Sequence, residues 1–280
     1  MHQHHRDGAF SENEEFHRSV AWTILGLSPL VALLLMGWKP ATYGKLNANA
    51  SQQRNWFGPK LPAKWCWMIF ESPNWIWVLY SLYDFGSLPP LPYLLLLLWF
   101  LLHYLYRSIL YPLCMSKDST FPIGILAFTV PYCVTNGYLQ TQGLLKFQTF
   151  PSGYQYSPVF VFGLLLGIGG FVIGFISDQT LLQLRKQSHE QIMDDNKKKT
   201  NYFVPRGGLF EYVTCPHFLG EILEWMGFCI ACQGSLASLS FVIWTACNLI
   251  PRALAQHQWY HLQFGSEYPA TRKAIVPFLL

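Results

Sequence analysis

Charged residues are scarce in this sequence. Asp, Glu, Lys and Arg together make up 12% of its 280 residues, whereas 51% are hydrophobic. A soluble domain carries about 25% charged residues, so this chain has too few to cover its own surface in water. A lipid bilayer is the natural solvent for the surplus apolar surface, and the composition therefore predicts a membrane protein.

The sequence also lacks the concentrated positive charge that a nucleic-acid partner requires. Its formal net charge is only +4, and its basic residues lie in short stretches between apolar runs. A nucleic-acid-binding protein gathers Lys and Arg on one face, together with aromatic residues. We therefore predict that no nucleic acid binds here.

Several motifs of soluble enzymes are absent. The sequence has no P-loop, H-E-x-x-H motif, Ser-His-Asp order or zinc-binding pattern, so hydrolase and kinase chemistry have no support. Cys229 and Cys232 form a C-x-x-C on an apparent membrane helix, but a metal site needs further ligands, and we predict no bound metal.

Run 158–177 is rich in glycine, yet Val172 stands where the last glycine of a G-x-G-x-x-G dinucleotide fingerprint is needed. The four-residue spacing of these glycines instead favours close helix packing.

Long apolar runs are the main feature of the sequence. A helix needs about 20 apolar residues to cross the hydrocarbon core of a bilayer. Seven candidates are 19–37, 65–83, 91–113, 121–143, 158–177, 218–236 and 238–255. We predict an all-α polytopic membrane protein, with seven transmembrane helices in one bundle formed by residues 19–280. Residues 1–18 are expected to form a polar, solvated tail, and residues 178–217 a cytosolic loop.

The distribution of Lys and Arg predicts the orientation. With seven spans, sixteen of the 19 Lys and Arg residues fall on one side of the membrane and three on the other. The sixteen lie in loop 38–64, the 107–120 junction, loop 178–217 and the C-terminal segment. Because cytosolic loops collect Lys and Arg, we expect a cytosolic C-terminus and a lumenal or external N-terminus.

Two polar residues inside the apolar runs are candidates for a functional site, because such residues are costly in a membrane. Glu71 lies in the second run, where an isolated carboxyl group is expected to be protonated and to donate a hydrogen bond. Pairing with an Arg is the alternative. Tyr104 lies one turn from Arg107 near the end of the third run, where it could instead be an ordinary interfacial aromatic residue.

Two further carboxylates lie three residues apart in the sixth run, on one helical face. Glu221 and Glu224 either pair with cations such as Arg185 and Arg252 or bind a polar ligand. The sequence leaves both interpretations open.

Several motifs occur along the chain in an order typical of one enzyme family. The C-terminal part contains VPRGGLFEYVTCPHFLGEILEWMGF, PRALAQHQWY and EYPATRKAIVPFLL. Upstream lie YGK, FESP around Glu71, LLHYLYR around Tyr104, TNGYLQ around Asn136, and SDQTLLQLRK. In these motifs the chain resembles the steroid 5α-reductases over residues 40–280, and most of all the plant-type steroid reductases. The polyprenal and enoyl-CoA reductases look less similar.

The resemblance implies a membrane reductase that uses NADPH. Such an enzyme would reduce the C4–C5 double bond of a 3-oxo-Δ4-steroid by hydride transfer to C5. It further implies that Glu71 and Tyr104 hydrogen-bond the C3 ketone. The cofactor-binding positions that it implies are Lys45, Asp178, Arg185, Tyr202, His217, Glu221, Arg252, His257 and Tyr260.

The sequence departs from the family pattern at four of the positions that we compared. Phe70 replaces a Gln just before Glu71, and Phe128 stands where animal members have an Arg. Gly174 and His217 each replace an Asn. These differences bear on the choice of steroid and on some cofactor contacts, but they leave Glu71 and Tyr104 in place.

Other functions stay open at this point. The same scaffold could serve a polyprenal or trans-2-enoyl-CoA reductase, and Lys197–Lys199 could supply the basic patch that a CoA substrate needs. A non-enzymatic membrane lipid-binding protein or a transporter is a further alternative, although transporters often have inverted repeats and none is evident. For the steroid reductase, we expect an apolar substrate that enters from the lipid and no required protein partner. We expect its membrane to be the endoplasmic reticulum, or the inner membrane if the protein is bacterial.

Overall fold

The computed structural model describes residues 2–37, 57–116, 119–195 and 202–280. Lys45, which the resemblance places at the cofactor, lies outside these described residues.

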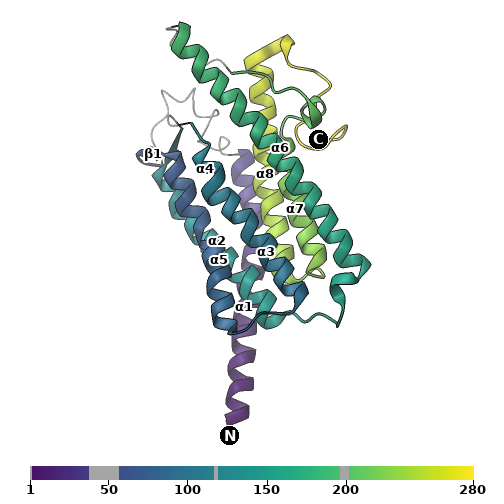
Figure 1. Cartoon of the computed structure of the whole chain (residues 1–280). Helices are drawn as coiled ribbons and strands as arrows, with labels where there is room; N and C mark the ends of the chain where they lie inside the picture. Colours follow the sequence, from purple (N-terminus) through teal and green to yellow (C-terminus); the bar gives the residue numbers. More distant parts are fainter. Residues whose placement is uncertain (1, 38–56, 117–118, 196–201) are drawn as a thin grey trace.

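Each predicted span corresponds to a long helix in the structure (Figure 1). These helices are α1 (His2–Gly37), α2 (Ala63–Phe85), α3 (Leu91–Leu105), α5 (Ile123–Gln142), α6 (Pro158–Asp195), α7 (Pro216–Ala231) and α8 (Leu236–Phe264). A π-helical turn, η2 (Tyr106–Leu110), and the short α4 (Tyr111–Leu113) continue α3. The prediction of a mostly helical chain is confirmed.

Four helical segments are long and apolar enough to cross a membrane. They are Glu12–Gly37, Leu91–Leu113, Pro158–Ser188 and Leu236–Glu267. The chain is therefore an integral membrane protein. The other three helices are shorter or carry polar residues, such as Glu71 and Asn74 in α2 and Asn136 and Gln140 in α5.

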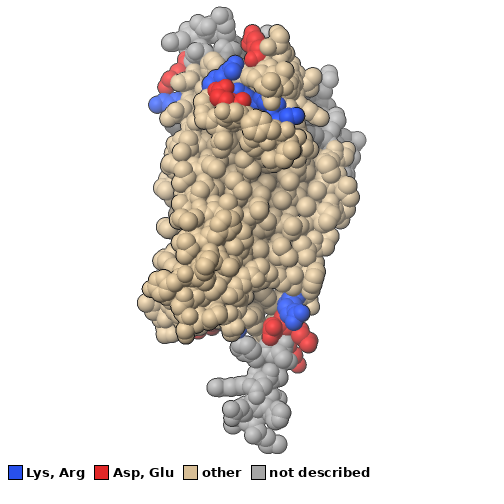
Figure 2. Space-filling view, turned by 90° about the vertical axis from the view of Figure 1, so that its right-hand side faces the viewer, with Lys and Arg blue, Asp and Glu red and all other residues tan. Residues whose placement is uncertain are grey.

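The connections between successive helices alternate between two ends of the bundle, with the two termini at opposite ends (Figure 1). Charged side chains gather at these two ends, and an almost uncharged band separates them (Figure 2). This distribution is expected of a protein whose middle lies in hydrocarbon. We refer to the end that holds the C-terminus as the C-terminal face.

A two-stranded pairing at the C-terminal face aligns α2 with α5. Strand β1 (Lys60–Pro62) directly precedes α2, and β2 (Thr120–Pro122) directly precedes α5. The strands are antiparallel, with Leu61 opposite Phe121. The two helices therefore start side by side, and both run away from the C-terminal face (Figure 1).

Glycines bring α6 and α7 into close contact. A Cβ atom on Gly163 would lie 2.6 Å from the Gly227 carbonyl oxygen, and one on Gly220 would lie 2.6 Å from the Gly170 carbonyl oxygen. No side chain larger than hydrogen fits between these backbones. The interpretation of the glycine-rich run as a packing surface is confirmed.

Two expectations about polar segments were wrong in part. The segment predicted as a polar tail is helical from His2, and His17 is buried with its ring nitrogen 3.0 Å from the Leu139 carbonyl oxygen. A hydrogen bond to the bundle therefore fixes the end of this segment. The predicted loop 178–217 begins as helix, because α6 continues to Asp195.

Candidate functional site

A chain of amide side chains surrounds the Tyr104 hydroxyl group. Gln140 Nε2 donates to the Ala237 carbonyl oxygen at 2.9 Å and to Asn136 Oδ1 at 3.3 Å. Because a carbonyl oxygen only accepts, these contacts determine how both amides are oriented. Asn136 Nδ2 then donates to the Tyr104 hydroxyl oxygen at 3.2 Å and to Asn74 Oδ1 at 3.1 Å.

Tyr104 itself is held inside the bundle. Its side chain is 6% exposed, and its ring lies 4.6 Å from that of Phe100 and 5.9 Å from that of Trp225, centroid to centroid. The alternative interpretation as an interfacial aromatic residue is therefore wrong. Since the hydroxyl oxygen accepts from Asn136, its own proton remains available to a further acceptor.

Glu71 lies on α2, one turn before Asn74, whose Nδ2 donates to the Glu71 carbonyl oxygen at 3.4 Å. Its carboxyl group interacts electrostatically with Arg107 and Tyr104. No described side chain hydrogen-bonds this carboxyl group. The structure therefore places Glu71 and Tyr104 in one polar cluster between α2, α3 and α5, which we call the Tyr104 cluster together with Asn74 and Asn136.

Arg107 links the Tyr104 cluster to two carboxylates. Its Nη1 atom donates to Asp178 Oδ2 at 3.3 Å, and its Nη2 atom lies 3.7 Å from Glu221 Oε2. The guanidinium group also lies over the rings of Trp67 and Tyr111, at 4.8 and 5.0 Å from their centroids. The structure thus pairs Glu221 with Arg107, a cation that the sequence analysis did not name as its partner.

Glu224 takes part in a separate, more deeply buried contact. Its Oε1 atom lies 2.9 Å from His103 Nδ1 and accepts a hydrogen bond from Trp99 Nε1 at 3.2 Å. Glu224 is 1% exposed. It therefore connects α7 to α3, and its partner is His103, the residue before Tyr104.

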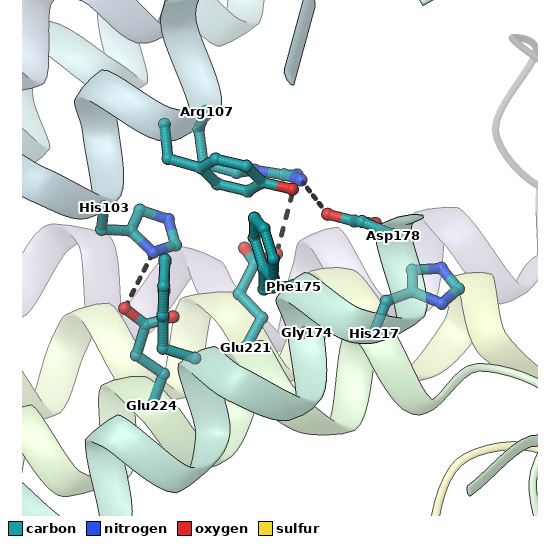
Figure 3. A pocket seen from close by; sticks show the side chains of 10 residues that line it. His103, Arg107, Gly174, Phe175, Asp178, His217, Glu221 and Glu224 are labelled. Carbon is teal, nitrogen blue, oxygen red and sulfur yellow. Dashed lines mark hydrogen bonds and ion pairs between the residues drawn. The ribbon is translucent and has the colours of Figure 1, made fainter. Parts of the chain in front are cut away.

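A small cavity lies between these groups (Figure 3). It is lined by Arg107 from η2, Asp178 from α6, and His217 and Glu221 from α7. Its volume is about 30 Å³, room for about one water molecule. Gly174 also lines it, and a Cβ atom there would lie 3.7 Å from the His217 carbonyl oxygen. Gly174 and His217, two positions at which the sequence departs from the family pattern, therefore line the same cavity.

A second group of predicted cofactor residues lies nearer the C-terminal face. Arg185 is exposed on α6 and interacts electrostatically with Tyr202 and Tyr260. Burial raises the pKa of the Tyr202 hydroxyl group, and the Arg185 guanidinium acts in the opposite direction. The Tyr202 ring packs on Trp259 of α8 at 4.9 Å. The structure thus brings three predicted residues together from α6, α8 and the segment that follows α6.

His257 belongs to a hydrogen-bonded chain near the C-terminus. Its Nδ1 atom lies 2.6 Å from Thr214 Oγ1, and its Nε2 atom lies 3.2 Å from His261 Nε2. Thr214 Oγ1 also lies 2.6 Å from the Tyr268 hydroxyl oxygen. Arg252 is partly buried on the same helix. No group of three metal-ligating side chains occurs among the described residues.

Comparison with known proteins identifies the family. The family model described as 3-oxo-5-alpha-steroid 4-dehydrogenase matches residues 119–280. The chain belongs to this family. The 3-oxo-5-alpha-steroid 4-dehydrogenase match includes α6, α7 and α8, and it therefore contains Asp178, His217 and Glu221 of the small cavity.

Relatives of this 3-oxo-5-alpha-steroid 4-dehydrogenase family member extend the match over most of the chain. The Steroid 5-alpha-reductase DET2 of Arabidopsis thaliana is 35% identical over 275 residues, 95% of this chain and 98% of that protein. The 3-oxo-5-alpha-steroid 4-dehydrogenase 1 of Mus musculus is 35% identical over 259 residues, 91% of this chain and 94% of that protein. The protein of the same name from Homo sapiens is 36% identical over 223 residues, 79% of this chain and 81% of that protein.

Sequence reasoning missed the central role of Arg107 and the participation of His103 and Asn74. The spacing of Tyr104 and Arg107 placed both on one helical face, and that signal alone could have nominated the arginine. No comparable signal pointed to His103, because its partner Glu224 is distant in sequence.

Proposed function

We propose that this protein is an NADPH-dependent reductase of a 3-oxo-Δ4-steroid. It transfers a hydride to C5 and reduces the C4–C5 double bond. Family membership supports the reaction class. The observation that carries the proposal is the Tyr104 hydroxyl group, which is buried beside Glu71 and accepts from Asn136, so that its proton can be donated to a ketone.

The chemical role of these groups follows from the charge that the reaction creates. Addition of a hydride to the β-carbon of an enone moves negative charge onto the ketone oxygen. Hydrogen-bond donors fixed in a water-poor site stabilise such charge strongly, and loss of one costs about 10²–10³-fold in rate. Tyr104 donates its hydroxyl proton to that oxygen. Glu71, protonated inside the apolar bundle, is the second donor.

The residues of the C-terminal face suit a dinucleotide phosphate. Arg185 is exposed on α6 beside Tyr202 and Tyr260, and guanidinium groups bind phosphates through several donors at once. Carboxylates such as Asp178 and Glu221 can accept from ribose hydroxyl groups. NADPH, when bound, supplies the hydride. Arg185, Arg252 and Lys45 would hold its phosphates, while Arg107 keeps the two carboxylates in place.

The arrangement of the chain in the membrane is part of the proposal. All seven long helices cross the bilayer, with the C-terminal face in the cytosol of the endoplasmic reticulum and the N-terminus in the lumen. The charged ends and uncharged middle of the bundle support this arrangement (Figure 2). A tag at the C-terminus should be digested by protease in sealed microsomes, and a tag at the N-terminus should be protected. Protection or digestion of both tags would contradict seven spans.

A deuterium-transfer experiment tests the reaction itself. Purified protein in lipid nanodiscs is given NADPH deuterated at the transferred position, together with a 3-oxo-Δ4-steroid, a polyprenal or an enoyl-CoA. We expect a 5α-reduced 3-oxo-steroid with deuterium at C5 and no comparable product from the other two substrates. Transfer to the polyprenal or the enoyl-CoA alone would overturn the assignment, and NADH in place of NADPH is the control for the cofactor.

A further inference from the structure

Tyr132 of α5 carries a buried hydroxyl group for which the described part of the chain provides no hydrogen-bond partner. Its ring is stacked on that of Trp244 in α8, with centroids 4.4 Å apart and planes at 12°. A buried polar group without a partner costs about 1–3 kcal/mol, and nearly all such groups in native proteins are hydrogen-bonded. The Tyr132 hydroxyl group is therefore a fixed hydrogen-bond donor for which the described residues provide no acceptor.

The fold places this hydroxyl group at the depth of Glu71. Because β1 and β2 pair, α2 and α5 start side by side and run in the same direction. A helix rises about 1.5 Å per residue, so Glu71 in α2 and Tyr132 in α5 lie at similar distances from their helix starts. The Tyr132 hydroxyl group is also close enough to Glu71 and Tyr104 to interact electrostatically with both.

The amides of the Tyr104 cluster do not supply the missing partner. Tyr132 and Asn136 are four residues apart and share one face of α5, but Asn136 Nδ2 donates to Tyr104 and Asn74. Asn136 Oδ1 accepts from Gln140. Three potential donors thus come from three helices and interact electrostatically: the Tyr104 hydroxyl from α3, the Glu71 carboxyl from α2 and the Tyr132 hydroxyl from α5.

We propose that Tyr132 is a third hydrogen-bond donor to the ketone oxygen of the substrate, an inference that rests on the proposed function. The ketone oxygen of the substrate is the hydrogen-bond acceptor that the described residues do not provide for Tyr132. The stack on Trp244 fixes the phenol ring, so little side-chain freedom is lost when the substrate binds. In the transition state the same hydroxyl group faces the developing negative charge, where a fixed donor acts most strongly.

Tyr132→Phe tests the proposal, because it keeps the ring on Trp244 and removes only the hydroxyl group. The matched control is Tyr138→Phe, the same change on the same helix at a tyrosine that packs against His17 and Trp77. Binding is measured for two unreactive ligands, a 5α-reduced 3-oxo-steroid and the same steroid without its 3-oxygen. Thermal unfolding without ligand and the Kd for NADPH serve as checks of folding.

We expect Tyr132→Phe to weaken binding of the 3-oxo-steroid by about tenfold, the loss of one net hydrogen bond. Binding of the deoxygenated steroid and of NADPH should stay unchanged, and kcat for the enone should fall by about 10-fold or more. The Tm should not fall, since an unpaired hydroxyl group is removed. Tyr138→Phe should resemble the wild-type protein in every measurement.

Two results would overturn the inference while leaving the proposed function intact. One is equal weakening of both steroids, which would mean that Tyr132 acts through packing. The other is wild-type binding and turnover in Tyr132→Phe. If the wild-type protein itself reduces no 3-oxo-Δ4-steroid with NADPH, the proposed function fails instead, so the two failures are distinct.

Discussion

The Tyr104 hydroxyl oxygen accepts a hydrogen bond from Asn136 Nδ2 across 3.2 Å. The Asn136 amide has this orientation because Gln140 Nε2 donates to its oxygen, and Gln140 is in turn oriented by the Ala237 carbonyl group. A backbone carbonyl group on α8 thus orients two amides, and the Tyr104 hydroxyl group keeps its own proton free for donation.

Replacing that amide by a carboxyl group should reverse the role of Tyr104. In Asn136→Asp, a carboxyl oxygen would accept the Tyr104 proton and withdraw it from the substrate. We expect kcat to fall by about 10²-fold, the cost of one lost oxyanion donor, with an unchanged Kd for NADPH. Single-turnover hydride transfer in NADPH-saturated protein measures this. Wild-type transfer in Asn136→Asp would show that the amide does not direct the tyrosine.

Glu71 and Tyr104 should behave as one catalytic unit. Glu71→Gln keeps the size of the side chain and a donor but loses acidity, while Tyr104→Phe keeps the ring and loses the hydroxyl group. Each change should lower kcat by about 10²-fold or more. Because effects within one unit are non-additive, the double variant should be little worse than the worse single one. Additive losses, or near-wild-type turnover in Tyr104→Phe, would contradict this assignment.

Replacement of Arg107 should mainly lower the Tm, whereas replacement of Arg185 should mainly raise KM for NADPH. Arg107→Ala leaves Asp178 and Glu221 without their shared cation, and breaking such a buried pair costs about 3–5 kcal/mol. The Tm should therefore fall clearly. Arg185 is exposed, so Arg185→Ala should leave the Tm unchanged and raise KM for NADPH far more than KM for steroid. Thermal unfolding in nanodiscs and initial rates measure both, and equal KM effects would argue that Arg185 has a structural role.

The contact between α6 and α7 predicts that alanine lowers the Tm at Gly163 but not at Gly169. In Gly163→Ala, the new Cβ atom would lie 2.6 Å from the Gly227 carbonyl oxygen and 2.7 Å from the Ala231 nitrogen. The helices must move apart, and the Tm should fall. Gly169 has nothing within 4 Å of its Cβ position, so Gly169→Ala should have little effect. Equal Tm values for the two variants would contradict the packing described for this helix pair.

The sequence by itself determined the class of the protein and the approximate limits of its helices. Apolar runs report directly on the solvent that a segment requires, so each predicted run became a helix. Polar residues inside those runs, such as Glu71, Tyr104 and Asn136, were visible for the same reason. The helices extend beyond the predicted apolar runs where a polar segment is also helical. α1 extends back to His2, and α6 continues to Asp195.

Only the tertiary structure decided which of these residues meet. The pairing of Arg107 with Asp178 and Glu221, and that of His103 with Glu224, join residues separated by 71 to 121 positions along the chain. Sequence periodicity describes one helix at a time, whereas a hydrogen bond between helices depends on how deeply and at what rotation each helix packs. That information lies in contacts such as the glycines of α6 against α7 and the pairing of β1 with β2. In the proposed site, contacts of this kind set the relative positions of Glu71, Tyr104 and Tyr132.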